Sequence, residues 1–360
     1  MIGRPGRTTT IEPKADAMNH RDEPARREFL RTTGLFTAGA GLWFECLFQQ
    51  LAQADETKPA GGGTIGRREI IKGLDGMSRV ADPGNSPFIG GHNAAAVITS
   101  AFFCRNEKLA PATQQELLAL IEARLLTSPI YQPQPDEAAD AALVAGLVND
   151  LDAGIDTLRS SGHNIIFAVV SLKALGELPE AATPARVGGL RKMVQSFGTT
   201  RNRGTPLPNP ASFVDLADEP RFIRFIFEEY LQALELYLNG KGHHGFAGHL
   251  LTVGHALLQL KRMGHVETAN KGIEAYWQFV HQARKGTFLG GQRVKDAPPD
   301  SPTPLEQDYW TEQTRRPLGL IPSCHLIKYP YSFYDLARDL SDESIKQRIF
   351  ERMYYLTAVS

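Results

Sequence analysis

Apolar residues recur every three or four positions along most of the chain from residue 91 onward, which is the spacing of helices that pack against a core. Prolines and glycines punctuate the gaps between these stretches and set the expected helix ends. No run of alternating β-branched residues is long enough to predict a sheet. The pattern predicts an all-α fold with helices over 92–105, 112–127, 137–159, 163–177, 184–198, 220–239, 244–262, 266–285, 325–339 and 342–358.

A short motif recurs four times, and each copy opens an apolar helix that is followed by a connector and a second helix. The four copies are Gly91-His92-Asn93, Gly162-His163-Asn164, Gly248-His249-Leu250 and Cys324-His325-Leu326. A recurring motif of this kind is typical of repeated helical units. We therefore expect repeated helical hairpins in an α/α-toroid-like ring or a tight helical array. An open solenoid is the alternative.

The choice between ring and solenoid decides what the four histidines do. In a closed ring the inner helices run parallel, so that His92, His163, His249 and His325 converge at one mouth. The partial positive charge of a helix N-terminus lowers the pKa of a nearby histidine and favours the neutral imidazole, which binds metal or acts as a base. In a solenoid the four side chains are spread along one edge, and each simply packs at the start of its own helix.

The N-terminal segment has the pattern of an export signal. An arginine pair, Arg26-Arg27, precedes Phe29-Leu30 and an uncharged stretch, and Ala52-Gln53-Ala54 fits a signal-peptidase site. The apolar stretch is too short for a spanning helix and contains Glu45, which argues against a permanent anchor. We expect a twin-arginine signal over 1–54, export to the periplasm or beyond through the twin-arginine machinery, and no stable membrane anchor after cleavage.

The rest of the chain divides into a linker with loops over 55–90, where Gly, Lys and Arg are frequent, and an all-α domain over 91–360. The signal holds seven of the 39 Lys and Arg and six of the 40 Asp and Glu, which leaves 32 positive and 34 negative charges. This balance gives no support to a nucleic-acid partner. Cys104 and Cys324 remain after cleavage, and the sequence allows either a disulfide or two buried thiols.

Two long segments, 199–219 and 286–322, are rich in proline and are predicted to be loops, either lids over a binding site or surface connections. The sequence gives only a weak metal signal, because it lacks His-x-x-x-His, His-Glu-x-x-His and Cys-x-x-Cys motifs. His244 and His249 are the weak metal candidates. No nucleotide-binding loop and no Gly-x-Ser-x-Gly elbow is present.

Lys328 lies three residues after His325, on the same face of the predicted helix. One interpretation is that its ammonium group binds an anionic substrate or an enolate. The other is that Lys328 forms a surface ion pair with Asp335 or Glu351.

The histidine segments resemble the questin oxidase-like family. The likeness lies in His92 to Ile98, in His244 to Leu257 followed by Glu274 to Trp277, and in His325-Leu326-Ile327-Lys328. That family is helical and related to flavin-independent, nicotinamide-dependent oxygenases that act on aromatic polyketides. The resemblance implies a site made of His92, His249 or His244, His325 and Lys328, with NADPH as cofactor.

The expected function is that of an exported enzyme with a His-lined pocket that acts on a small organic or aromatic compound, and the resemblance implies that it is an oxidoreductase. In this interpretation His92, His163, His249 and His325 act as bases, hydrogen-bond donors or ligands, and Lys328 stabilises negative charge. One alternative is a non-catalytic helical-repeat binding protein of the periplasm. Another is an α/α-toroid lyase or glycan hydrolase, which requires paired carboxylates at the mouth.

Overall fold

The structure, a computed structural model, describes residues 64–198, 214–242, 244–286 and 301–357. These residues belong to one compact unit that begins at Gly61. The predicted export signal lies outside the described residues, as do most of the segment from 199 to 219 and much of that from 286 to 322. Among the described helices, none combines the length and the apolar character that crossing a membrane requires.

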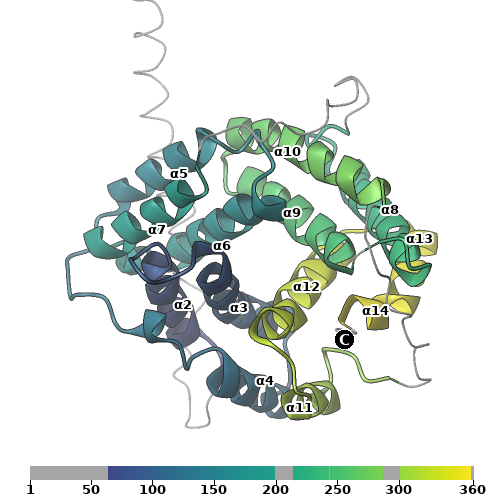
Figure 1. The fold of residues 1–360 in the computed structure, drawn as a ribbon, viewed down its shortest axis with the longest axis horizontal. Helices are drawn as coiled ribbons and strands as arrows, with labels where there is room; N and C mark the ends of the chain where they lie inside the picture. The colour runs from purple at the N-terminus through teal and green to yellow at the C-terminus, as the bar shows by residue number, and fades with distance from the viewer. Residues whose placement is uncertain (1–63, 199–213, 243, 287–300, 358–360) are drawn as a thin grey trace, which may run out of the picture. The chain divides into compact units, whose positions relative to one another are not determined.

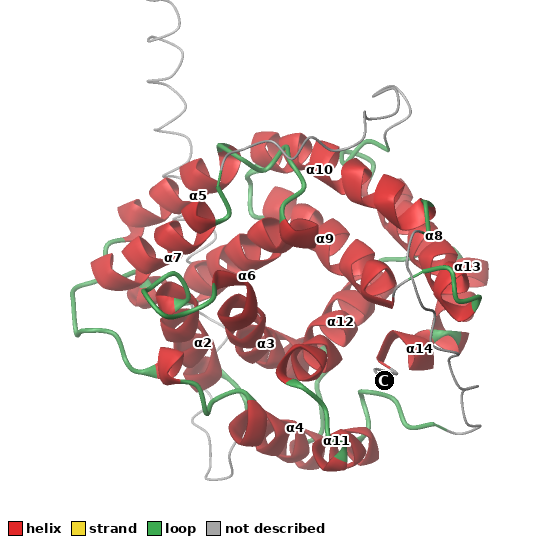
Figure 2. Cartoon of the chain, in the orientation of Figure 1, coloured by secondary structure: helices red, strands yellow, loops and turns green. Residues whose placement is uncertain are grey.

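The described residues contain thirteen α-helices and no strand, which confirms the predicted all-α class (Figure 2). The helices are α2 (Arg67–Arg79), α3 (Pro87–Asn106), α4 (Pro111–Arg124), α5 (Val144–Asp152), α6 (His163–Glu177), α7 (Pro184–Ser196), α8 (Glu219–Leu238), α9 (His244–Arg262), α10 (Val266–Arg284), α11 (Gln307–Arg315), α12 (Leu320–Arg338), α13 (Glu343–Glu351) and α14 (Met353–Thr357).

Four helices, α3, α6, α9 and α12, form a closed inner ring (Figure 1). Helix α3 packs against α6 and α12, and α9 packs against the same two neighbours. These helices are buried over most of their length; in α12 every residue from Ser323 to Ala337 is buried. A helix that is apolar on all sides can only be stable inside a layer of other helices.

The inner helices run in the same direction, because equivalent ends meet at both ends of the ring. The four motif histidines contact one another near the N-terminal ends. Near the C-terminal ends, Asn106 of α3 binds Asp335 of α12, and Lys173 of α6 binds Gln259 of α9. The ring arrangement, rather than a solenoid, is therefore the one that this chain adopts.

The outer helices surround the inner ring in a second layer (Figure 1). Each inner helix is flanked in sequence by an outer helix on both sides, so the chain order outer, inner, outer occurs four times: α2-α3-α4, α5-α6-α7, α8-α9-α10 and α11-α12-α13. The outer helix α8 shows why this works, since Phe222, Ile226 and Tyr230 are buried at helical spacing while Glu228 and Glu235 face solvent. The repeating unit is thus three helices, one more than the predicted hairpin.

The predicted linker over 55–90 is wrong for residues 67–79, which form α2, and for residues 87–90, which begin α3. Helix α2 buries Ile70, Leu74 and Met77 against α3, and Glu69 accepts a hydrogen bond from the Gly66 backbone N–H at 2.8 Å to cap its start. The expectation of a loop throughout 286–322 is also wrong, since residues 307–315 form α11. The predicted helix 137–159 is confirmed only for 144–152.

Cys104 and Cys324 are both free and buried, so this pair forms two thiols rather than a disulfide. Burial raises the pKa of each thiol to about 12, which makes both poor nucleophiles near neutral pH.

Candidate metal centre

The four motif histidines, predicted to meet in a closed ring, do meet. The ring centroids are 4.2 Å apart for His92 and His163, 4.7 Å for His163 and His249, and 5.3 Å for His249 and His325. The centroids of His325 and His92 lie 5.2 Å apart, which closes the circle. All four side chains are buried, at 7% exposure or less. We call these four residues the histidine cluster.

The cluster lies deeper than the sequence suggested. Helix α6 begins at His163, but α3, α9 and α12 each begin five residues before their histidine. Consequently the helix N-terminus is not the main influence on the histidines. Burial is the largest cause that lowers the pKa of His92 to about 2, followed by the charge of Lys328. Burial likewise holds the pKa of His163 well below its ordinary value, so both imidazoles are neutral near pH 7.

Hydrogen bonds to the backbone fix which nitrogen of each ring carries the proton. His92 Nδ1 lies 2.8 Å from the carbonyl oxygen of Phe88, and His249 Nδ1 lies 2.6 Å from that of Gly245. His163 Nδ1 contacts the carbonyl oxygen of Ser160. A carbonyl only accepts, so Nδ1 is the donor in all three neutral rings and Nε2 keeps its lone pair.

The loop before His163 is built around this contact. Ser160 and Ser161 have φ of 45° and 58°, and Gly162 has φ of 86°. Side chains rarely adopt this left-handed conformation, and each such non-glycine residue costs on the order of 1–3 kcal/mol. The strained turn places the Ser160 carbonyl under the His163 ring and so sets its orientation.

The Nε2 atoms point at one another across the centre of the cluster. His163 Nε2 lies 2.9 Å from His92 Nε2 and 3.0 Å from His249 Nε2. With Nδ1 protonated, these short contacts bring lone pairs face to face, and a cation between them removes the repulsion. Ligand atoms of His92, His249 and His325 all lie within 4.8 Å of one another. A tetrahedral zinc ion with bonds of about 2.0–2.1 Å separates its ligand nitrogens by about 3.3 Å, which this geometry approaches.

Tyr329 and Phe88 are two of the aromatic neighbours of the histidine cluster. The Tyr329 ring stacks on His325 with centroids 4.4 Å apart, and its hydroxyl lies 3.1 Å from His249 Nδ1. On the other side, the Phe88 ring lies 4.6 Å from His92 and 4.9 Å from His163, between centroids, and remains 38% exposed. Phe88 therefore lies between the cluster and solvent.

Lys328 is buried beside the cluster rather than paired on the surface. The structure shows no hydrogen bond or ion pair between its ammonium group and the described residues, and Nζ lies 5.6 Å from the centroid of the Phe167 ring. Burial lowers the pKa of Lys328 to about 8. The predicted surface pairs with Asp335 and Glu351 are absent. Asp335 instead binds His255 and Arg338.

Of the two weak metal candidates from the sequence, only His249 has a described side chain, and it belongs to the cluster. Familiar metal motifs do not reveal this cluster, because they place ligands three to five residues apart, whereas these histidines come from four different helices. Tyr329 and Phe88 were missed as members of the site. Tyr329 carried a signal, since it lies one turn after His325 on the same helix face.

Comparison of the chain with known protein families, curated proteins and solved structures finds no match. The fold and the site alone define the class: a closed ring of helices around a buried four-histidine cluster. The resemblance to the questin oxidase-like family remains a prediction.

Proposed function

We propose that the histidine cluster binds a transition-metal ion and that the protein is a metal-dependent enzyme acting on a small organic or aromatic compound, an oxidoreductase in the first instance. The observation that carries the proposal is the pair of Nε2–Nε2 contacts at 2.9 and 3.0 Å between rings whose Nδ1 atoms already donate to carbonyls. Backbone acceptors on the second ring nitrogen are the usual support of metal-ligating histidines.

The ligand set suits iron, zinc, copper or nickel, because imidazole is a ligand that all four accept. Neutral histidines leave the full charge of a divalent ion available to polarise a bound oxygen atom. Lys328 lies next to the site with a pKa near neutrality, so it can stabilise negative charge that develops on a bound substrate. The exposed Phe88 and its neighbour Ile89 (46% exposed) offer an apolar approach for an aromatic ring.

The alternatives receive less support from the described residues. A glycan hydrolase or lyase needs two carboxylates that face each other across the substrate. The buried carboxylates in the described chain are each bound to a basic side chain, in the pairs Glu69–Arg68, Asp75–Arg186, Glu229–Arg284 and Asp335–His255. The non-catalytic scaffold remains the competing hypothesis, and metal analysis separates it from the enzyme.

The test compares the purified protein with His92→Gln and His249→Gln. We expect about one metal ion per chain in the wild type and at least a 100-fold loss of affinity in each variant, since even supporting residues of metal sites contribute 10–100-fold. His265→Gln is the matched control, because His265 caps α10 away from the cluster and is only partly buried. Variants that lose thermal stability while the wild type binds no metal would favour the scaffold.

Oxygen consumption identifies the reaction class. The iron-loaded protein is mixed with a panel of hydroxylated aromatic compounds, with and without NADPH, and oxygen uptake is followed by electrode. Uptake that needs both metal and substrate supports the oxidoreductase. Substrate turnover without oxygen or NADPH would move the protein to another enzyme class.

A further inference from the structure

A small cavity lies inside the ring, one helical turn beyond the histidine cluster. It is lined by all four inner helices, and its polar lining includes Thr99, Thr252, His255, Lys328, Tyr331 and Ser332. Thr252 and Lys328 each lie three residues after a cluster histidine, a rise of about 4.5 Å along a helix. The cavity therefore lies about one helical turn from the candidate metal site, toward the C-terminal ends of the inner helices. We call it the axial chamber.

The axial chamber has the size and the polarity to hold water. Its volume of about 20 Å³ exceeds the roughly 10–15 Å³ that a single water molecule needs. Two of its polar groups have no partner of their own in the described structure, because the Tyr331 hydroxyl is buried without a hydrogen bond and Lys328 Nζ has none either. Buried polar groups of this kind are normally satisfied, by protein or by ordered water.

The far wall of the chamber is a hydrogen-bonded chain that leads to the other end of the ring. Ser332 Oγ lies 3.1 Å from His255 Nδ1, and His255 Nε2 lies 2.7 Å from Asp335 Oδ2. Gln259 also donates to Asp335 Oδ2, at 2.8 Å. Because the carboxylate only accepts, His255 donates from Nε2, and its Nδ1 accepts the Ser332 hydroxyl proton.

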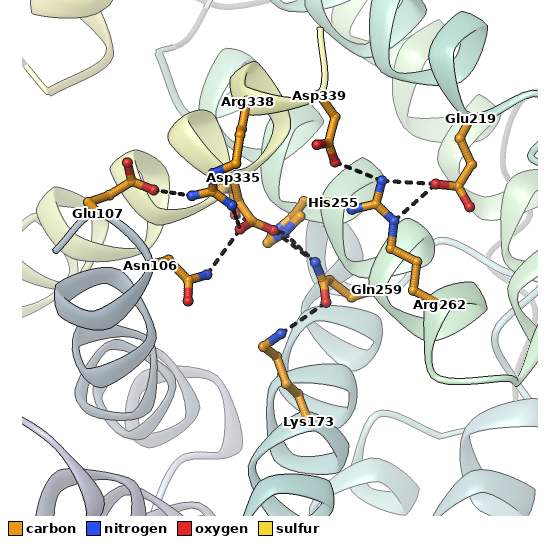
Figure 3. Close-up of polar contacts among 11 residues, drawn as sticks. Asn106, Glu107, Lys173, Glu219, His255, Gln259, Arg262, Asp335, Arg338 and Asp339 are labelled. Atoms are coloured by element: carbon orange, nitrogen blue, oxygen red, sulfur yellow. Dashed lines mark hydrogen bonds and ion pairs between the residues drawn. The ribbon is translucent and has the colours of Figure 1, made fainter. Parts of the chain in front are cut away.

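Asp335 is anchored as a carboxylate (Figure 3). Arg338 and Asn106 donate to its other oxygen, each at 3.0 Å. Burial alone would raise the pKa of Asp335, but the hydrogen bond and charge of His255, the charge of Lys173 and the Arg338 hydrogen bond lower it below its ordinary value. The carboxylate therefore places a fixed negative charge 2.7 Å from His255 Nε2.

We propose that the axial chamber holds ordered water and that His255, stabilised by Asp335, is the internal proton acceptor for the histidine cluster. This inference rests on the proposed function, since it gives the metal site a proton route separate from the Phe88 side.

The proposed transfer conserves protons and involves no redox change. A water molecule that ionises at the cluster gives one proton to the chamber water, which passes one proton to Ser332 Oγ. Ser332 gives its own proton to His255 Nδ1. His255 then carries protons on both nitrogens as the imidazolium, opposite the Asp335 carboxylate. The reverse sequence returns the proton to the cluster.

Charged and polar groups surround His255 from each neighbouring inner helix. Helix α12 contributes Asp335, Arg338, Tyr331 and Lys328, and α6 contributes Lys173, whose Nζ is 3.1 Å from Gln259 Oε1. Helix α3 contributes the neutral Asn106 and Thr99. The positive charges of Lys328 and Lys173 would repel a positive charge on His255. The negative charge of Asp335, 2.7 Å from His255 Nε2, offsets this repulsion.

The first experiment is a high-resolution crystal structure of the protein as purified. We expect an ordered water molecule in the axial chamber, within hydrogen-bond distance of Tyr331 Oη and of Ser332 or Lys328. A chamber without water density would overturn it.

The second experiment measures proton transfer itself. The protein is loaded with Co²⁺, the pH is changed rapidly in a stopped-flow instrument, and the visible spectrum of the cobalt reports ionisation at the site. We expect His255→Gln to slow this change at least 10-fold without altering the final spectrum, because glutamine keeps the hydrogen bonds to Asp335 and Ser332 but carries no extra proton. Asp335→Asn should also slow it.

Arg262→Gln is the control variant, since it removes the neighbouring ion pairs with Glu219 and Asp339 while leaving the relay intact (Figure 3). An unchanged rate in His255→Gln overturns the relay while the metal site stands. Failure to bind cobalt at all overturns the proposed function, and the relay with it. A variant that binds cobalt with wild-type affinity has kept the fold, so its rate can be interpreted.

Discussion

Each motif histidine is preceded by a residue whose size is set by the next inner helix. A Cβ atom on Gly91 would overlap the Phe167 ring, one on Gly162 would overlap Val253, and one on Gly248 would overlap the Tyr329 ring. In each of these three cases, the residue that the Cβ atom would overlap lies four positions after the cluster histidine of the neighbouring inner helix. The Gly-His pattern is therefore a packing rule: glycine lets the neighbouring helix approach closely enough for the histidines to meet.

In the fourth copy of the motif the larger residue stands before the histidine and the smaller one stands on the neighbouring helix. Cys324 replaces the glycine, and residue 96, four positions after His92, is alanine instead of a large side chain. Both are fully buried. A small residue opposite a larger one conserves the volume at the point where α12 and α3 close the ring.

The pH dependence of the free energy of unfolding of Lys328→Met tests whether the lysine is buried. Unfolded lysine has a pKa of 10.5 and the folded value is about 8. Between these values the unfolded chain binds more protons, so the free energy of unfolding rises with pH, and below pH 8 the charged lysine destabilises the fold by about 3 kcal/mol at 1.36 kcal/mol per pKa unit.

We expect metal-free Lys328→Met to be more stable than wild type at pH 7 by up to about 3 kcal/mol, with the difference disappearing by about pH 10.5. Urea unfolding at both pH values measures it. Lys271→Met, at a half-exposed surface ion pair with Asp152, is the control and should show no such pH dependence. A difference that is constant with pH would mean that Lys328 is not buried in its charged form.

At the scale of elements, the sequence predicted most inner and outer helices. The inner ones are long apolar stretches, and outer helices such as α8 and α10 have one apolar face. The boundaries of α3 and α12 were placed five residues too late, since the residue before each histidine, Gly91 or Cys324, was taken as a helix start. In fact it serves close packing, and the true starts carry Pro87 at the first position of α3 and Gly319 before α12.

Two helices were missed for a different reason. In α2, the glycines at 73 and 76 and the charges at its start suggested a linker. Residue 73 is a glycine because a Cβ atom there would overlap Ile98 of α3. This glycine therefore also marks a close crossing of two helices. Helix α11 is short and polar, and only Tyr309, Trp310 and Gln313 are buried, so few apolar residues mark it within a proline-rich segment.

Gly248→Ala tests the packing rule at the element level. Overpacking a filled core costs about 1–3 kcal/mol, so this variant should lose that much stability although alanine favours helix. Gly188→Ala in α7 is the matched control, because nothing lies within 4 Å of the added methyl group. It should gain up to about 1 kcal/mol from helix propensity. Chemical unfolding of both variants gives the answer, and equal effects of the same sign would contradict the rule.

For the whole molecule, the sequence predicted that a ring would bring the four histidines together, and the closed inner ring confirms this. The sequence could not supply the tautomers or the distances, because they depend on the backbone carbonyls of Phe88, Ser160 and Gly245 and on a strained turn. Nor could it give the chamber, whose walls come from four separate helices. Long-range packing, rather than local motif, creates both.

Export remains a prediction for the whole chain and has its own test. Replacing Arg26 and Arg27 by lysine keeps the charge but removes the arginine pair that the twin-arginine machinery recognises. We expect the double variant, expressed in a bacterium with that pathway, to stay in the cytoplasm while the wild type reaches the periplasm, as judged by cell fractionation. Equal distribution of the two proteins would contradict the predicted signal.

X-ray absorption spectroscopy at the metal edge of the purified protein, after elemental analysis has identified the ion, tests the histidine cluster most directly. We expect a first shell of nitrogen at about 2.0–2.1 Å, with imidazole scattering from three or four histidines. Two results would contradict a metal site at the histidine cluster. One is a protein that carries no metal and does not bind added iron, zinc or cobalt, and the other is a metal bound by sulfur at about 2.3 Å.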